Sequence, residues 1–309
     1  MLDRVLEGLC ERGVLASPDP SHYLYVFNNR ASINLIIFDK NTKERLVFLK
    51  ISDQRDFRRT FEVLSKVRRI VGDAIPEPVC VMAVDRWQVL ATRAYRLDLL
   101  AGKPRLGFRD QCRVVDGAMQ RLVELHSRTR GGSIAIDDPV CQETIAAMER
   151  RFFDQWDDQH LFDAFREHMR ALAREGDLTI PEIPQHGDLV VFNTALVDGN
   201  KEKIMFIDWD SYGQTQLACL DAVTFLVTFA NRYGAGLYSE SRLSRHLAEV
   251  AKRYCDAIGV PRRDLHRLYP LCLLHYAELR REFGVAKGQE FAYREMKRFF
   301  DQRERFVLA

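Results

Sequence analysis

The segment that most constrains this chain runs from Gln185 to Asn193 and reads Gln-His-Gly-Asp-Leu-Val-Val-Phe-Asn. It places the carboxylate of Asp188 and the amide of Asn193 five residues apart, on what we expect to be a loop. A later apolar run, Ile204–Ile207, ends at a second carboxylate, Asp208, which lies fifteen residues after Asn193. A short apolar run of this kind is typical of a buried strand. The pattern therefore predicts polar groups on a loop and a further carboxylate at the end of a strand.

The sequence between Asn193 and Asp208 predicts a β-hairpin. Two apolar stretches flank the turn-forming residues Asp198-Gly-Asn-Lys201, and Asp-Gly between apolar runs is the strongest short-range hairpin signal. A hairpin folded at this turn would return Asn193 and Asp208 to the same end, where their oxygen atoms suit Mg²⁺. One aspartate for an acceptor hydroxyl, with an asparagine and a second aspartate on a metal, are the parts that phosphoryl transfer uses. The alternative is a surface hairpin whose Asn and Asp only form turns.

The same residues carry a resemblance to a known family. His186-Gly-Asp188, followed by Asn193 and then by Asp208-Trp-Asp210, resembles the signature of the aminoglycoside phosphotransferase / choline kinase family. These are protein-kinase-like enzymes that phosphorylate small molecules. The resemblance implies that Asp188 is the catalytic base and that His186 braces its loop. It also implies that Asn193 and Asp208 hold Mg²⁺, with Asp210 as a further metal contact, and that ATP or GTP is the phosphoryl donor.

Two further positions belong to this resemblance. Asp221 is similar to a later structural aspartate of the family, and we expect it to cap the helix that follows. Gly187 stands where protein kinases usually carry arginine, and it matches the small-molecule kinases.

The order of expected elements also fits such a fold. Strands are expected at Tyr23–Phe27, Ser32–Phe38, Glu44–Ile51, Val79–Val84 and Gln88–Arg93, with one helix inserted at Asp56–Val71. Beyond them the chain is expected to be mostly helical. We therefore predict an α+β, two-lobed protein-kinase-like fold, with a mainly antiparallel sheet plus one helix in the N-terminal lobe (1–94) and a largely helical C-terminal lobe (95–309).

The resemblance places the nucleotide on the N-terminal lobe. Lys50 ends an apolar strand, and a lysine there grips the nucleotide's phosphates as a compact point charge. Its usual partner is a glutamate on the following helix, where Glu62 is the only one. The helical phase argues against Glu62, because it falls nearly opposite the apolar stripe. Asp56 is the substitute, and the pairing of Lys50 stays open.

A glycine-free loop, 28–32, would cover the phosphates, with Ser32 or successive backbone amides as contacts. The nucleobase would lie against the backbone of the segment that joins the lobes, at Thr92 and Ala94. This placement is implied by the resemblance, and no side chain there identifies the base.

Composition places few limits on partners. With 46 basic and 44 acidic residues the net charge is +2, so charge gives no argument for nucleic acid, and we expect no nucleic-acid partner. No apolar run approaches the length of a membrane span, so we expect no membrane insertion. The seven scattered cysteines contain no C-x-x-C pair and indicate reduced thiols, which fits the cytoplasm. The oligomeric state is left open.

The expected function is transfer of a γ-phosphoryl group from a nucleoside triphosphate to a hydroxyl of a small molecule. A sugar, a polyol, an amino alcohol and an aminoglycoside all fit as acceptors. Acids between Gln142 and Asp163 favour a cationic acceptor, whereas Arg262, Arg263 and Arg267 offer the opposite charge. The alternatives are a catalytically weak nucleotide-binding regulator with a kinase fold, or a protein kinase.

Overall fold

We describe a computed structural model of the chain, which covers residues 2–16, 22–29, 32–39, 41–102, 105–176, 178–282 and 284–308, with the backbone alone at 22–29. Backbone packing divides it into two compact units. The first comprises Met1–Asp98 and Leu196–Trp209, and the second comprises Leu99–Ala195 and Asp210–Ala309. The first unit is thus assembled from two separate parts of the sequence. The expected lobe boundary after Ala94 stays a prediction.

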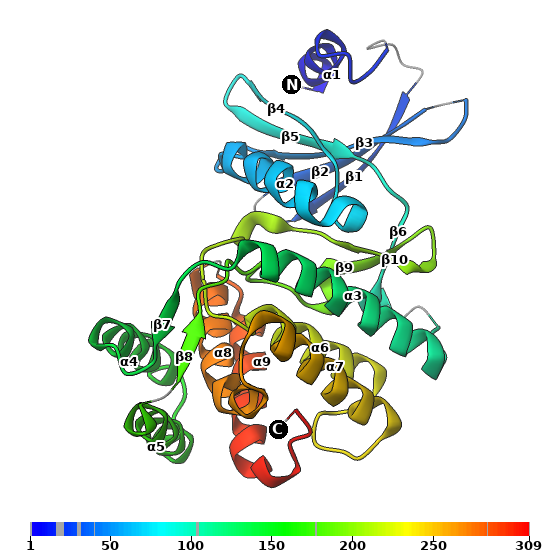
Figure 1. Cartoon of the computed structure of the whole chain (residues 1–309). Coiled ribbons are helices and arrows are strands. Elements are labelled where there is room, and N and C mark those ends of the chain that lie inside the picture. The colour runs from blue at the N-terminus through cyan, green and yellow to red at the C-terminus, as the bar shows by residue number, and fades with distance from the viewer. Residues whose placement is uncertain are drawn as a thin grey trace. The chain divides into compact units, whose positions relative to one another are not determined.

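The first unit is built on a five-stranded antiparallel sheet with the order β1-β2-β3-β5-β4 (Figure 1). Its strands are β1 (His22–Asn29), β2 (Ser32–Asp39), β3 (Arg45–Ser52), β4 (Pro78–Val84) and β5 (Trp87–Arg93). β1 and β2 pair from His22↔Asp39 to Asn29↔Ser32, so only two residues join them. These are Arg30 and Ala31 of the expected phosphate-covering loop, and they lie outside the described residues.

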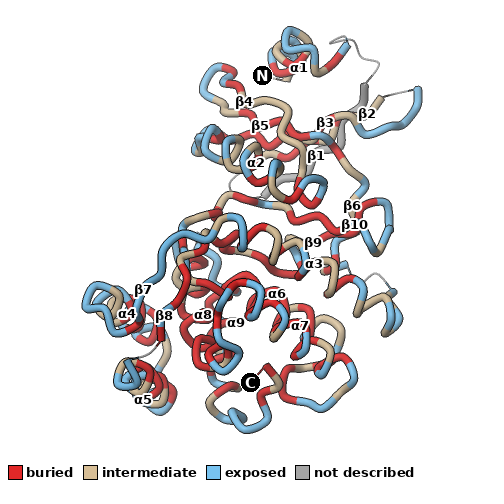
Figure 2. The backbone as a smooth tube through the Cα atoms, in the orientation of Figure 1, coloured by how far each residue is buried: buried red, intermediate tan, exposed pale blue. Residues whose placement is uncertain are grey.

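Two helices pack in this unit, and each buries one face. α1 (Leu2–Glu11) buries Val5 and Leu9 in a core that includes Leu35, Leu49 and Met82 of the sheet. α2 (Arg58–Val71) packs against β4 and buries Leu64, Val67 and Val71, which are spaced at three and four residues. Because both helices are amphipathic, their packing leaves the charged faces to solvent, as the alternating colours of Figure 2 show.

The predicted hairpin is confirmed. β9 (Thr194–Val197) and β10 (Asn200–Phe206) are joined by Asp198 and Gly199, and both turn residues have positive φ, at 54° and 68°. Positive φ at both central residues is the geometry that the twist of a two-residue hairpin demands, and Asp-Gly supplies it at low cost. β9 also pairs with β6 (Leu97–Leu99), which gives a three-stranded sheet in the order β10-β9-β6.

The second unit is largely helical. Its helices are α3 (Phe108–Thr129), α4 (Pro139–Phe153), α5 (Gln159–Glu175), α6 (Leu220–Tyr233), α7 (Arg242–Ile258), α8 (Arg262–Glu282) and α9 (Ala286–Asp301). This unit also contains a short antiparallel pair of strands, β7 (Ser133–Ala135) and β8 (Thr179–Pro181). α6 and α8 are buried along most of their lengths, with α8 against α6, α7, α9 and α4 (Figure 2). α6 and α8 are therefore the core of this unit.

The predicted sheet, its inserted helix and the helical remainder are confirmed. The last helix ends at Asp301, and a short 3₁₀ turn, Arg303–Arg305, follows it. The three-residue strands β6, β7 and β8 were not expected. A strand of three residues shows too few alternations for its sequence to reveal it. No helix in the described part of the chain combines the length and the apolar character that crossing a membrane requires.

Candidate active site

The segment that leads to Asp188 is held by backbone pairing inside the second unit. Ile183 N–H donates to Gln216 O at 2.9 Å, and Gln185 N–H donates to Thr215 O at 3.1 Å. In return, Gly213 N–H donates to Gln185 O at 2.8 Å. These bonds fix the chain up to the residue before His186, so the loop that carries Asp188 starts from a rigid base.

Asp221 anchors the loop itself. Its buried carboxylate accepts hydrogen bonds from His186 N–H at 2.6 Å and from Gly187 N–H at 3.0 Å. The structural role predicted for Asp221 is as an α6 cap, but α6 has no side-chain hydrogen bond at its N-cap. The carboxylate instead pairs loop amides from thirty-five residues earlier, because two buried N–H groups would otherwise lack acceptors.

Two buried side chains of other helices stand behind Asp221. His126 of α3 lies with Nε2 3.4 Å from Asp221 Oδ2, and its Nδ1 is 2.7 Å from the hydroxyl of Tyr254 on α7. Burial raises the pKa of Tyr254 well above its ordinary value, so this hydroxyl stays protonated. The loop anchor is therefore tied to α3 and α7 as well as to α6.

His186 and Gly187 shape the loop locally. Asp188 N–H donates to His186 Nδ1 at 3.3 Å, so this buried ring supports the residue two positions on. Gly187 has φ 80°, and a Cβ there would lie 3.1 Å from both the Cβ and the carbonyl oxygen of Ser211. Only glycine meets both conditions easily, so an arginine, as protein kinases usually carry, would be strained here.

Asp188 and Asn193 meet in this loop. The Asn193 amide, at the end of the 3₁₀ turn Val191–Asn193, donates through Nδ2 to the carbonyl and to the carboxylate Oδ2 of Asp188, both at 2.9 Å. Both hydrogens of the amide are thus directed within the loop. This orientation leaves Asn193 Oδ1 as the acceptor oxygen of the amide.

An arginine that the sequence did not single out also contacts Asp188. Arg280 of α8 places Nη1 2.6 Å from Asp188 Oδ2, and its Nη2 donates to Gly187 O at 3.3 Å and to Ser211 Oγ at 3.4 Å. Its guanidinium also lies over the ring of Tyr276, 5.4 Å from the centroid. Arg280 lies ninety-two residues after Asp188, so no local pattern in the sequence indicates this contact.

The stem of Arg280 fits against α9 because position 288 is glycine. A Cβ on Gly288 would lie 2.3 Å from Arg280 Cγ and 2.9 Å from its Cβ. The Arg280 side chain is only 7% exposed, against 17% for that of Asp188. Arg280 is therefore held by packing as well as by charge.

Lys50 and Asp208 form a separate pair in the first unit. Lys50 Nζ donates to Asp208 Oδ1 at 2.8 Å; the lysine side chain is 11% exposed and that of the aspartate 46%. Asp208 has φ 64°, in the left-handed region that non-glycine residues rarely occupy. Aspartate adopts this conformation more readily than most residues, and strained backbone conformations cluster at functional sites.

The other nucleotide residues expected from the sequence also lie in the first unit. Ser32 and Thr92 are buried in β2 and β5, and Ala94 N–H donates to Leu46 O at 3.3 Å, so that amide already has an acceptor. Glu62 lies on the exposed side of α2, as its helical phase predicts, whereas the ion pair described for Lys50 is with Asp208. The pairing of Lys50 with Glu62, and the role of all four residues, stay predictions.

Among the described residues, no three His, Cys, Asp or Glu side chains gather closely enough to hold a metal by themselves. Mg²⁺ bound with a nucleotide takes one or two protein oxygens and completes its shell with phosphates and water. Asn193 Oδ1 and the half-exposed carboxylate of Asp208 are donors of that kind. Asp210 follows in the 3₁₀ turn Trp209–Ser211 and is partly exposed. These donors fit Mg²⁺, and the convergence of Asn193 with Asp208 stays a prediction.

Several residues of the segment between Gln142 and Asp163 have structural partners. Trp156 stacks on Tyr293 with ring centroids 4.4 Å apart. Asp158 caps α5 through Leu161 N–H and accepts from Tyr293 OH at 2.7 Å. Glu149 pairs with Arg166 at 3.0 Å. Two of the acids that favoured a cationic acceptor are thus engaged in holding α4, α5 and α9 together.

The basic residues on α8 are paired in the same way. Arg262 pairs with Asp256 through Nε at 2.7 Å, and Arg267 pairs with Asp264 and Glu175. The buried His168 lies with Nε2 2.7 Å from Arg267 O. Neither the acids between Gln142 and Asp163 nor the arginines of α8 therefore identify the acceptor.

Comparison with known proteins identifies the fold. No protein-family model matches the chain, and no curated protein matches its sequence. A solved structure of a thermostable mutant of aminoglycoside phosphotransferase APH(4)-Ia, in a ternary complex with ADP and hygromycin B, superposes with a TM-score of 0.59 at 13% identity; the match covers 96% of this chain and 98% of that one.

Two kinases of other small molecules give similar matches. Choline kinase from Cryptosporidium parvum Iowa II has a TM-score of 0.56 at 11% identity, and the match covers 97% of this chain and 95% of that one. Plasmodium vivax ethanolamine kinase has a TM-score of 0.56 at 12% identity, with 95% and 86% covered. The chain has the fold of the aminoglycoside phosphotransferases and of the choline and ethanolamine kinases.

Proposed function

We propose that this protein is a small-molecule kinase of the aminoglycoside phosphotransferase / choline kinase family, which transfers the γ-phosphoryl group of ATP or GTP to a hydroxyl. Asp188 positions the acceptor hydroxyl and takes its proton, and Lys50 binds the nucleotide's phosphates. The observation that carries the proposal is the loop at Asp188, which Asp221, His186 and Asn193 hold by hydrogen bonds to its backbone and carboxylate.

The rigidity of this loop suits the reaction. Phosphoryl transfer depends mainly on positioning and electrostatic stabilisation, because the protein supplies little covalent chemistry. Asn193 and Arg280 both contact Oδ2 of Asp188, at 2.9 and 2.6 Å, which restrains the carboxylate from two directions. A restrained carboxylate keeps an acceptor hydroxyl at one position relative to the phosphate that it attacks.

Mg²⁺ would be held by Asn193 and Asp208, with Asp210 as a further contact, and it would neutralise charge on the phosphates. Lys50 already pairs with Asp208, so it stands beside a proposed metal ligand. The neighbours with this fold support a nucleotide donor, because two of them are named as complexes with ADP or AMP-PNP. Those names also support a small-molecule acceptor, since both complexes contain hygromycin B.

The acceptor is a small hydroxyl compound: a sugar, a polyol, an amino alcohol or an aminoglycoside. A screen decides among them by measuring the release of ADP or GDP from Mg²⁺-nucleotide with separate pools of each class. Asp188→Asn is the control. Release with one pool that disappears in the variant supports the proposal and names the acceptor class. Release that is equal in wild type and variant contradicts it, and nucleotide binding with no release in any pool favours a regulator.

A further inference from the structure

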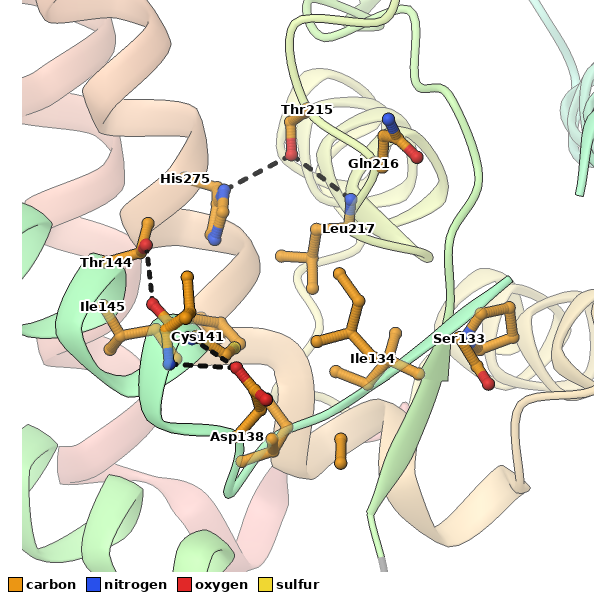
Figure 3. A pocket seen from close by; sticks show the side chains of 16 residues that line it. Ser133, Ile134, Asp138, Cys141, Thr144, Ile145, Thr215, Gln216, Leu217 and His275 are labelled. Atoms are coloured by element: carbon orange, nitrogen blue, oxygen red, sulfur yellow. Dashed lines mark hydrogen bonds between the residues drawn. The ribbon is translucent and has the colours of Figure 1, made fainter. Parts of the chain in front are cut away.

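A cavity lies within the second unit, outside the candidate active site. Its volume is about 460 Å³, and its walls come from β7, β8, α4, α8 and the segment 215–217 (Figure 3). None of Asp188, His186, Asn193 and Arg280 lines it. The volume falls within the range of sites for small molecules, about 300–1,000 Å³.

The lining is mainly apolar, and part of it is exposed. Ile136, Ile145, Ile180 and Leu217 contribute to the walls. Two more, Ile134 and Val140, have 38% and 72% of their surface exposed and are among the few large apolar side chains that the described structure leaves exposed. Exposed apolar side chains that gather at a cavity often mark a ligand site.

Most polar side chains of the cavity already have partners. Asp138 accepts from Val140 N–H at 2.9 Å and from Cys141 N–H at 3.2 Å as the cap of α4, and Thr144 donates to Val140 O at 2.8 Å. Figure 3 shows these bonds at the edge of the cavity. Ser133 and Gln216 also line the cavity but are exposed to solvent, so His275, on α8, is the partly buried side chain whose hydrogen bonds are incomplete.

The partners of Thr215 determine which ring nitrogen of His275 carries the hydrogen. The Thr215 hydroxyl oxygen accepts from Leu217 N–H at 3.2 Å and lies 3.3 Å from His275 Nδ1. Its own hydrogen has an acceptor only if it points to Nδ1. Burial lowers the pKa of His275 to about 4, so the ring is neutral at pH 7. A neutral ring that accepts at Nδ1 carries its hydrogen on Nε2.

The Nε2–H group is directed at the cavity. Figure 3 shows the second ring nitrogen of His275 pointing away from Thr215 and into the pocket. No described residue accepts a hydrogen bond from it, although the ring is only partly exposed. An oxygen atom of a ligand in the cavity could accept this hydrogen bond in place of water.

We propose that this cavity binds a small, uncharged, mainly apolar molecule, which carries one hydrogen-bond acceptor that meets Nε2–H of His275. The apolar walls take the body of the molecule, and the donor of His275 fixes its orientation. A charged ligand is disfavoured because the apolar walls and the neutral ring of His275 would not compensate its desolvation. This site is separate from the proposed transfer reaction and can be tested without it.

The test compares two probes of nearly the same shape, acetophenone and α-methylstyrene, in which C=CH₂ replaces C=O. Binding is measured by titration calorimetry, with the side-chain ¹⁵N–¹H signal of His275 as a second readout. We expect acetophenone to bind about three- to tenfold more tightly, the contribution of one hydrogen bond. We also expect it to shift the Nε2–H signal, whereas α-methylstyrene leaves the signal near its place.

Three variants separate the donor from the cavity. His275→Phe should bind both probes equally, and His160→Phe, a change at an exposed histidine outside the cavity, should keep the preference. Thr144→Phe, at an exposed position on the rim, should block both probes without disturbing the core. It also keeps the test decisive if His275→Phe does not fold. Equal affinity for the two probes in the wild type, no binding of either, or unchanged binding in Thr144→Phe would overturn the proposal.

Discussion

Arg280 Nη1 lies 2.6 Å from Oδ2 of Asp188, and both side chains are largely removed from water. The arginine comes from α8, ninety-two residues after the aspartate, and it also bonds to the loop carbonyl of Gly187. A buried carboxylate without a partner is costly, so the arginine offsets the cost of burying the Asp188 side chain. This pair therefore links the helical core of the second unit to the proposed catalytic base.

Removing the arginine tests that link. Arg280→Ala leaves Asp188 without its guanidinium partner, and we expect the free energy of unfolding to fall by about 3 kcal/mol, the usual cost of breaking a buried pair. Arg281→Ala is the matched control, because this neighbour pairs with Glu278 at a more exposed position and should cost about 1 kcal/mol or less. Urea denaturation measures both. Equal losses of unfolding free energy in Arg280→Ala and Arg281→Ala would contradict the prediction that the buried pair stabilises the protein more than the exposed pair.

The space beside Arg280 can be tested from α9. A methyl group added by Gly288→Ala would overlap the stem of Arg280, so we expect a loss of about 1–3 kcal/mol from overpacking, together with reduced transfer activity. Gly102→Ala is the control, because a Cβ there meets nothing within 4 Å and φ is not positive. Thermal unfolding measures both variants. If Gly288→Ala unfolds at the wild-type temperature, Arg280 is not held as described.

Asp221 is expected to matter more than an exposed aspartate with the same number of bonds. Asp221→Ala leaves the buried amides of His186 and Gly187 without acceptors, at about 1–3 kcal/mol each. Asp138 also accepts two backbone N–H bonds, but at the exposed start of α4, where Asp138→Ala should cost about 1 kcal/mol. Comparing the two by urea denaturation isolates the effect of burial. A smaller loss for Asp221→Ala than for Asp138→Ala contradicts the anchoring role.

His168 predicts a pH dependence of stability. Burial lowers its pKa to about 4, below the ordinary value of 6.5, so the unfolded chain takes up this proton first as pH falls. The contribution of His168 is therefore complete above pH 6.5 and is lost between pH 6.5 and 4, by up to about 3 kcal/mol. His168→Gln should lack this part of the pH dependence, whereas His160→Gln, at an exposed position, should keep it. Parallel profiles for wild type and His168→Gln would contradict the assignment.

Much of the fold could be predicted because its signals are local. Asp198-Gly199 identified the β9–β10 hairpin, since few residues adopt positive φ at both turn positions. The apolar spacing of α2 identified its buried face and left Glu62 outside it. Such features depend on neighbours within one element, which the sequence displays directly.

The contacts that complete the candidate site could not be predicted in this way. Arg280 and Asp221 reach the loop from distant helices, and their partners depend on tertiary packing. The family resemblance implied that Asp221 caps the helix that follows, whereas its carboxylate accepts hydrogen bonds from the loop amides of His186 and Gly187. The same is true of the separate cavity. The hydrogen on Nε2 of His275 depends on the hydrogen bonds of Thr215, which lies sixty residues away in the chain.

The measurement that tests the central claim most directly compares Mg²⁺-nucleotide affinity with γ-phosphoryl transfer in three proteins: wild type, Asp188→Asn and Asp208→Ala. We predict that Asp188→Asn binds Mg²⁺-nucleotide as the wild type does and transfers no phosphate. Asp208→Ala should lose the Mg²⁺-dependent part of nucleotide affinity. Full transfer by Asp188→Asn would contradict the assignment of the base, and with it the proposed kinase mechanism.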